Sequence, residues 1–159
     1  MTSWLSSPAR LRRALQTLRE RGDGLGPWLL RLWLAQEFGR AGWTKLAGGW
    51  QAPEWFAGLA FPPPLAWLPP DLNWGLAAVT EVLAAAALLL GWPLRLAALA
   101  LLFVTGVAVY AVHFDLGWAG WDQIDTPEGQ GFKLPLMIAL MLTVLLERGP
   151  GRWAWKGPR

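Results

Sequence analysis

Two long apolar runs dominate the pattern of hydrophobic and polar positions along the chain. Trp74–Trp92 contains a single charge, Glu81, and Pro93–Phe114 is interrupted only by Arg95 near its start and His113 near its end. Each run is about twenty residues long, the length of helix that crosses roughly 30 Å of hydrocarbon. The pattern therefore predicts two membrane-spanning helices in the middle of the chain.

Two further segments match this pattern less well. Leu134–Leu146 holds thirteen uncharged residues, but Phe132, Lys133 and Arg148 can extend it because long side chains reach back to the membrane surface. Pro27–Leu46 is the most polar segment, since it is interrupted by Arg31, Gln36, Glu37, Arg40 and Lys45. Hydropathy alone would reject this first segment as a span.

The charged residues between these segments alternate in sign. Residues 1–26 carry five arginines against two acidic residues, and the chain is basic again after residue 147. Ala47–Leu94 and Leu96–Phe132 contain no Lys or Arg, while their connecting stretches hold six acidic residues. This is the positive-inside pattern of a membrane protein with both termini in the cytoplasm. Two termini on the same side require an even number of spans, and the chain has four candidate segments. We therefore predict an all-α fold, a four-helix transmembrane bundle.

The same signs divide the chain into three parts. Residues 1–26 form a basic cytoplasmic segment in which Ser7-Pro8 can begin a helix and Leu11, Leu15 and Leu18 recur at helical spacing. We expect an amphipathic interfacial helix on the anionic inner leaflet, with a solvated basic tail as the alternative. These residues contain no apolar core of a secretory signal. Residues 27–149 form the membrane domain, and residues 150–159 form a basic cytoplasmic tail.

Tryptophan and proline mark the first outer loop. Pro53 is suited to start a short helix that carries Trp55, Phe56 and Leu59, and the prolines that follow would end it. This loop is too apolar for a free linker, so we expect it to fold over the bundle. The other outer tryptophans are explained by the preference of indole for the headgroup level, and they are Trp50, Trp67, Trp74, Trp118 and Trp121.

Composition excludes several kinds of chemistry. Only 16% of the 159 residues are charged, against roughly 25% in soluble domains, which agrees with a lipid environment. The sequence has no cysteine and one histidine. Iron–sulfur clusters, cysteine zinc sites and thiol catalysis are therefore excluded, and one subunit cannot supply two histidines to a haem or three to a metal. We expect no metal site, and membrane lipid rather than nucleic acid as a partner.

Polar residues within the predicted spans suggest a site. Ionisable groups are costly at the bilayer centre and must face one another or water. We expect Glu37, Arg40, Lys45, Glu81 and His113 to converge under the outer loop, with Glu37 and Arg40 able to pair on one helix face. Two interpretations stay open: a buried ion pair of Glu81 with Arg40 or Lys45 that only fixes helix register, and a site for a quinone headgroup or for protons.

Other positions in the spans are assigned structural roles. Arg31 and Arg95 lie near the inner surface, where we expect both to be snorkelling anchors. Small residues let helix backbones approach one another closely. We therefore predict close helix contacts at the alanine run Ala84–Ala87 with Gly91, and at Gly106 on the facing helix.

Four motifs in order resemble the DoxX family of small four-helix membrane proteins. Arg40–Leu46 reads RAGWTKL, like the family's Gly-x-x-Lys-Leu end of the first helix, and Leu90–Leu96 follows the Glu81 helix with a Gly-x-x-x-Arg-Leu pattern. Tyr110–Phe114 resembles the end of the third helix in an HvfX-like branch, and Gly149–Trp153 resembles its GPGRW exit from the fourth. The chain departs from the family in lacking the usual Ser-x-Asp after this last motif.

The resemblance implies a location in the cytoplasmic (inner) membrane of a bacterium or archaeon, and a place in a complex with other protein subunits. Members are similar to the membrane subunit of thiosulfate:quinone oxidoreductase, and the family's characteristic residues correspond to Lys45, Glu81 and Arg95 here. This implies a quinone-interacting membrane subunit of a redox complex. A non-catalytic membrane anchor that recruits a partner enzyme is the alternative, and whether the chain is an enzyme stays open.

The quinone hypothesis assigns a role to each polar residue of the predicted site. Glu81 and His113 would hydrogen-bond the quinone or pass protons, and Arg40 or Lys45 would stabilise the reduced oxyanion. Glu81, Lys45 and His113 are the candidate catalytic residues. Quinone contacts are assigned to Glu37, Arg40, Trp43 and Tyr110. Haem and iron–sulfur cofactors are not expected.

Overall fold

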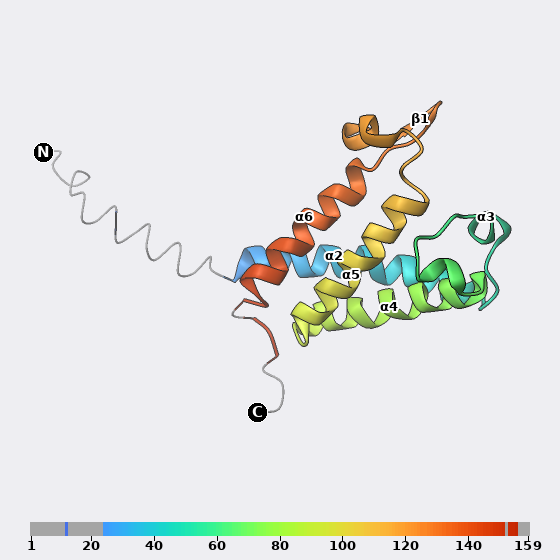
Figure 1. The fold of residues 1–159 in the computed structure, drawn as a ribbon. Coiled ribbons are helices and arrows are strands. Elements are labelled where there is room, and N and C mark those ends of the chain that lie inside the picture. The colour runs from blue at the N-terminus through green and yellow to red at the C-terminus, as the bar shows by residue number, and fades with distance from the viewer. Residues whose placement is uncertain (1–11, 13–23, 152, 156–159) are drawn as a thin grey trace, which may run out of the picture.

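A computed structural model describes Arg12, residues 24–151 and residues 153–155. Four long helices account for most of this part of the chain: α2 (Leu25–Ala47), α4 (Pro70–Leu90), α5 (Leu94–Ala111) and α6 (Lys133–Arg148) (Figure 1). They occupy the four predicted segments, and the all-α prediction is confirmed. The predicted amphipathic helix within residues 1–26 lies almost wholly outside the described residues.

The connections contain short elements. Helix α3 (Glu54–Ala57) begins directly after Pro53, which is extended and precedes the first helical turn, so the predicted short helix is confirmed. It lies in the loop between α2 and α4, which keeps the name first outer loop from the side predicted for it. A 3-10 turn, η1 (Leu65–Trp67), follows it. The loop between α5 and α6 holds a second 3-10 segment, η2 (Gly117–Asp122), and a small antiparallel hairpin of β1 (Asp125–Thr126) and β2 (Gly129–Gln130).

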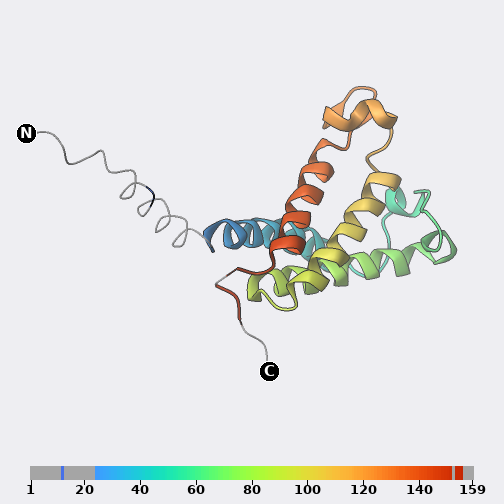
Figure 2. The ribbon, with the colours of Figure 1, turned by 60° about the vertical axis from the view of Figure 1, so that its left-hand side comes forward.

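The long helices form two antiparallel pairs. Helix α2 packs along α4, and α5 packs along α6. Figures 1 and 2 show α5 and α6 rising together at an angle from the line of α2 and α4, so that the pairs meet near the start of α5 and diverge toward the loops. The shared apolar core lies where they meet and includes Leu34, Leu88, Leu101, Leu142 and Leu145, all fully buried.

Glycines on α2 set the close approach of the first pair. A methyl group at Gly42 would lie 2.8 Å from the backbone oxygen of Ala78 and 2.9 Å from Cβ of Glu81, and one at Gly39 would touch Cβ of Ala85. The alanine face of α4 therefore packs against α2, as the interface of small residues requires. The expectation that Gly106 faces this alanine run is wrong, because nothing lies within 4 Å of a Cβ at that position.

The prediction that Arg31 snorkels is also wrong, since its side chain is buried with 2% exposure. It donates from Nε to the Leu88 carbonyl at 2.7 Å, from Nη2 to Leu89 at 2.7 Å, and from Nη1 to Pro150 at 3.0 Å and Trp153 at 3.1 Å. Helix ends leave their last four carbonyls without partners inside the helix. The guanidinium donates to two of these terminal carbonyls of α4 and also to two carbonyls of the segment after α6.

The remaining two terminal carbonyls of α4 are also satisfied. The Gly91 amide donates to Ala87 at 2.8 Å, and the Trp155 amide donates to Leu90 at 3.0 Å. Gly91 has a φ of 77° and lies so close to Arg31 that a Cβ would be 2.8 Å from Nη2. The start of α2, the end of α4 and the residues after α6 are therefore joined in one cluster. We call it the inner clamp, after the side predicted for it from the sequence, and define it by Arg31, Gly91, Pro150, Trp153 and Trp155.

Two helices of the described part, α4 and α5, are long and apolar enough to cross a membrane. Helix α6 has 16 residues, and α2 carries Arg31, Glu37, Arg40 and Lys45 along its 23 residues. Arg95 is exposed at the start of α5.

Candidate functional site

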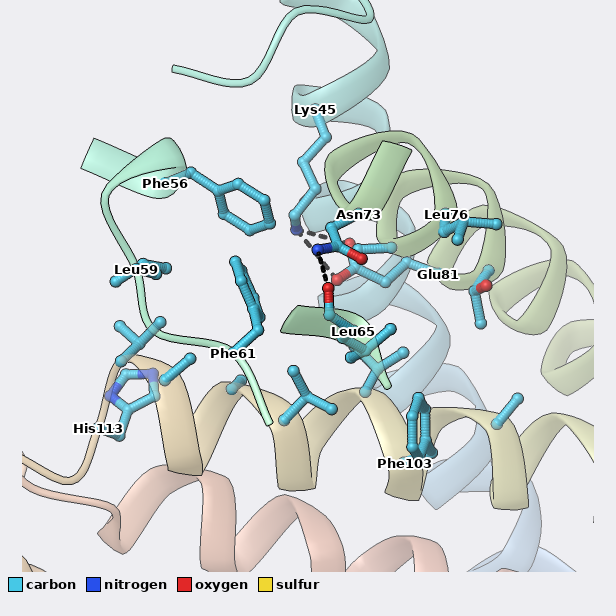
Figure 3. Close-up of a pocket in the computed structure, with 18 of the residues that line it drawn as sticks. Lys45, Phe56, Leu59, Phe61, Leu65, Asn73, Leu76, Glu81, Phe103 and His113 are labelled. Atoms are coloured by element: carbon cyan, nitrogen blue, oxygen red, sulfur yellow. Dashed lines mark hydrogen bonds and ion pairs between the residues drawn. The ribbon is translucent and has the colours of Figure 1, made fainter. Parts of the chain in front are cut away.

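A pocket of about 510 Å³ lies between the diverging halves of α4 and α5, beneath the first outer loop (Figure 3). Its walls are mostly apolar, with Leu76, Phe103, Val104 and Val107 from the two helices and Phe56, Leu59 and Phe61 from the loop. Five polar residues line it as well: Lys45, Asn73, Thr80, Glu81 and His113. A pocket of this size and lining is typical of small-molecule sites.

A buried ion pair forms the polar end of the pocket. Lys45 in the last turn of α2 donates from Nζ to both carboxylate oxygens of Glu81 on α4, at 2.7 and 3.0 Å. Their side chains are 19% and 6% exposed. Lys45 Nζ also lies 5.8 Å from the centre of the Trp74 ring, within reach of a cation–π interaction. Since Gly42 lies one turn before Lys45, the close approach of α2 and α4 brings the two charges together.

The first outer loop is held against α4 by polar contacts to its backbone. The Trp74 indole donates to the Gly49 carbonyl at 3.2 Å, the Asp71 carboxylate accepts from the Ala52 amide at 2.7 Å, and Asn73 Nδ2 donates to the Leu65 carbonyl at 3.0 Å. Phe56 is buried and its ring packs 4.9 Å from that of Trp74. The prediction that this loop folds over the helices is therefore confirmed, and it roofs the pocket.

Asn73 contributes an unused acceptor. The residue is 5% exposed and lies beside the ion pair in Figure 3. Its Nδ2 serves the Leu65 carbonyl, but Oδ1 is buried with no hydrogen-bond partner among the described residues. A buried acceptor without a donor costs free energy, so this atom is suited to receive a hydrogen bond from a bound molecule.

His113 lies across the pocket from the ion pair (Figure 3). It follows the end of α5, and its amide donates to the carbonyls of Ala108 and Val109. Burial lowers the pKa of the imidazole, because a low-dielectric environment disfavours the cation, and the charges of Asp125 and Asp115 oppose this. The neutral imidazole can both donate and accept a hydrogen bond.

The structure separates the sequence candidates into two groups. Lys45, Glu81 and His113, the three candidate catalytic residues, line the same pocket. The four residues assigned to quinone contacts, Glu37, Arg40, Trp43 and Tyr110, do not line it and are exposed.

The expected convergence of Glu37 and Arg40 with the other charges is therefore wrong. These residues lie on the face of α2 turned away from α4, and the single salt bridge of the described residues joins Lys45 to Glu81, so the expected pairing of Glu37 with Arg40 is wrong as well. Helical spacing showed that these polar residues share a face but did not show which neighbour that face meets.

Sequence reasoning missed Asn73 and the apolar wall of α5. Asn73 is the single asparagine of the sequence and lies two helical turns before Glu81, on the same face of α4. That spacing was a usable signal. The wall formed by Phe103, Val104 and Val107 carried none, because apolar residues on a membrane helix look alike whether they face lipid, core or a pocket.

Comparison with known proteins identifies the family. The DoxX family model matches residues 26–114 of the chain. The chain belongs to the DoxX family. It is also 34% identical over 133 residues to an uncharacterized protein of Haemophilus influenzae, covering 82% of this chain and 81% of that protein. No solved structure matches the chain.

The segment matched to DoxX holds the whole site. It contains α2, α4 and α5, and every residue that lines the pocket falls between Lys45 and His113. Helix α6 lies outside the match and contributes no lining residue. The DoxX part of this membrane protein is thus the part that forms the pocket.

Proposed function

We propose that α2, α4, α5 and α6 of this DoxX-family membrane protein all cross the cytoplasmic membrane, with the inner clamp on the cytoplasmic side. The clamp supports this arrangement because it joins the start of α2 to the segment after α6, so the chain enters and leaves the helices at the same end. The sequence is basic both before α2 and after α6, as expected for cytoplasmic segments. The acidic connections, with η2 and the hairpin, then lie outside.

The pocket in this arrangement binds the headgroup of a membrane quinone, and the protein acts as the quinone-interacting membrane subunit of a redox complex. One observation carries the proposal: a buried Lys45–Glu81 pair lines one end of a mostly apolar pocket between two apolar helices. A quinone has the matching shape, since a flat polar ring needs a few placed polar groups and its tail needs apolar surface.

The residues fit such a ring in both redox states. Lys45 has one proton left after its two bonds to Glu81 and can donate it to a carbonyl or oxyanion. Asn73 Oδ1 can accept from a hydroxyl of the reduced ring. Glu81 and His113 can hold or pass the protons that accompany reduction. A bound quinone would supply the two-electron chemistry. Since the sequence has no cysteine to hold an iron–sulfur cluster, the electrons would come from a substrate or a partner subunit.

A membrane anchor or accessory subunit is the second candidate. The observation that favours it is the ion pair itself, because two short hydrogen bonds already satisfy the Glu81 carboxylate and Lys45 without a ligand. Exposed tryptophans of the outer loops, Trp67 at 78% and Trp118 at 81%, would then meet a partner enzyme.

Quinone binding to the purified protein separates the two candidates. Titration of a short-chain quinol into protein in lipid nanodiscs should give saturable binding, and a photoreactive quinone should label Phe56–Phe61 and Phe103–His113. Glu81→Gln and Lys45→Met should weaken binding roughly tenfold or more, since each removes a charged hydrogen-bonding group. Tyr110→Phe is the matched control, because Tyr110 is exposed on the same helix as the pocket wall. Equal binding by all variants would refute the site.

A further inference from the structure

The exposed face of α2 carries charge at the middle of the helix. Gln36, Glu37 and Arg40 lie near the centre of Leu25–Ala47, and all three are exposed. Neither Glu37 nor Arg40 makes a salt bridge within the described part of the chain. If α2 crosses the membrane, this face meets lipid at the depth where charged side chains are most costly. Such residues face a protein neighbour or water in known membrane proteins.

The exposed positions follow the spacing of a helix pair. Leu29, Trp33, Gln36, Arg40, Trp43 and Ala47 are all exposed and succeed one another in steps of four, three, four, three and four residues. This is the repeat of the contact line between two helices that cross at a shallow left-handed angle. We call these six residues the α2 seam.

The buried face of α2 lies opposite the seam. Its buried residues, Arg31, Leu34, Ala35, Phe38 and Gly42, hold the helix to its own α4 and to the inner clamp. The helix therefore has two separate contact faces, one used within the chain and one without a neighbour among the described residues.

We propose that the α2 seam is a two-fold interface with a second copy of this chain in the membrane. The argument is charge complementarity. Two copies in one membrane run parallel when related by an axis along the membrane normal, so equivalent residues lie at the same depth. Glu37 and Arg40 are about 4.5 Å apart along the helix axis. Each Arg40 then reaches Gln36 and Glu37 of the other copy, so the Arg40–Glu37 pair forms twice, once on each side of the axis.

A different partner subunit fits this face less well. A face with one acid and one base three residues apart complements itself, whereas a separate partner would need its own matching pair at the same depth. The two exposed tryptophans, Trp33 at 53% and Trp43 at 68%, flank Gln36 and Arg40 on the seam, and Glu37 lies beside them. The tryptophans can therefore seal the charges from lipid. The inference rests on the membrane-spanning position proposed for α2 and not on quinone binding.

Charge exchange between two copies tests the pairing. Arg40→Glu leaves only acidic residues at positions 37 and 40, and Glu37→Arg leaves only basic ones. Neither variant can form the pair within one helix, so attraction between them requires two chains. Co-expressed with different affinity tags in native membranes, the two variants should co-purify at least several-fold more than either does with itself. The proposal would be overturned if the two variants did not co-purify, or if they co-purified no more than each variant does with itself.

Cysteine cross-linking tests the seam without added charge, which covers the case in which a charge variant fails to insert. Because the sequence has no cysteine, single substitutions report alone. Gln36→Cys and Trp43→Cys should form disulfide-linked dimers in oxidised membranes, since disulfides need Cβ atoms roughly 4 Å apart. Leu99→Cys on α5 and Leu140→Cys on α6 are controls, exposed by 52% and 61%. Cross-links to another protein, or equal dimer at the controls, would refute the second copy as occupant.

Labelling of the helix ends separates failure of the interface from failure of the span. Gly26→Cys and Gly48→Cys mark the two ends of α2. A membrane-impermeant thiol reagent should label position 48 from outside and position 26 only after the membrane is opened. Labelling as expected without cross-links on the seam would refute the dimer alone, and labelling of both positions from one side would refute the span and the dimer together.

Discussion

His113 is a single reporter for the environment of the pocket. The sequence has one histidine, so a histidine-labelled sample shows one imidazole by NMR. Burial favours the neutral form, and we expect the titration midpoint to lie below the usual value of about 6.5. Because the unfolded chain then binds the proton more readily, the free energy of unfolding falls as the pH drops through this range.

The acidic residues near His113 supply the control for this titration. Asp125 and Asp115 raise the imidazole pKa, against the effect of burial. Asp125→Asn should therefore lower the midpoint further, whereas Glu54→Gln, in the other outer loop, should leave it unchanged. A wild-type midpoint at or above the usual value would show that the imidazole is not buried in the pocket.

The Lys45–Glu81 pair allows structure and function to be separated at the scale of two residues. Lys45→Met leaves a carboxylate of 6% exposure without its cation, which should lower the free energy of unfolding by roughly 3 kcal/mol. Replacing both residues, Lys45→Met with Glu81→Leu, should recover most of this loss, because an apolar pair needs no compensation. Thermal unfolding in detergent measures both.

The same double variant distinguishes the two candidate functions. If the pair binds quinone, the double variant is stable and does not bind, and if the pair only fixes helix register, the double variant keeps the function of the assembled complex. Lys133→Met is the control for loss of a lysine, since Lys133 is exposed at the start of α6. A stability loss at Lys133 equal to that at Lys45 would contradict the account of the ion pair.

At the scale of elements, the contact between α2 and α4 depends on Gly42. A methyl group there meets the Ala78 carbonyl oxygen, which is backbone and cannot turn away. Gly42→Ala should lower the free energy of unfolding by about 1–3 kcal/mol and weaken quinone binding, because it pushes Lys45 away from Glu81. Thermal unfolding and the quinol titration measure the two effects.

Gly106→Ala is the matched control for this element. Gly106 is also inside a long helix, but its Cβ position is open. Alanine is the better helix former by roughly 0.8–1 kcal/mol, so this variant should unfold at the same or a higher temperature. Similar destabilisation by both substitutions would mean that Gly42 has no special contact with α4.

At the scale of the whole molecule, Arg31 holds the two helix pairs together at their inner end. It donates to carbonyls after α6 as well as to the end of α4. Arg31→Lys should destabilise the fold by several kcal/mol, because one ammonium cannot reach carbonyls on two sides and some are left buried without a donor. Protease cleavage after residue 149 should become faster. Arg95→Lys, an exposed arginine at the start of α5, should change neither.

The whole-molecule arrangement also explains the pocket. The two helix pairs are joined at the clamp and diverge toward the outer loops, so the space between α4 and α5 widens where the first loop covers it. The position of the pocket is thus a consequence of where the pairs are tied, and no single helix pattern contains it.

The sequence by itself determined the four helical segments and the short helix after Pro53. It also showed that Glu81 would pair with either Lys45 or Arg40, without deciding between them. Hydrophobic runs, a proline start and rare charges are local signals, and they act over a few turns of one helix. Lys45, Glu81 and His113 were found for this reason, since each is an ionisable group within a predicted span, and all three line the pocket.

Only the tertiary structure decided which charge pairs and which is exposed. Arg31 and Arg40 are both arginines on α2, yet Arg31 is buried under four carbonyls and Arg40 is exposed on the seam. The difference comes from the rotation of α2 about its axis, which the close approach of Gly39 and Gly42 to α4 sets. Helical spacing tells which residues share a face, but the partner of that face is a property of the packed molecule.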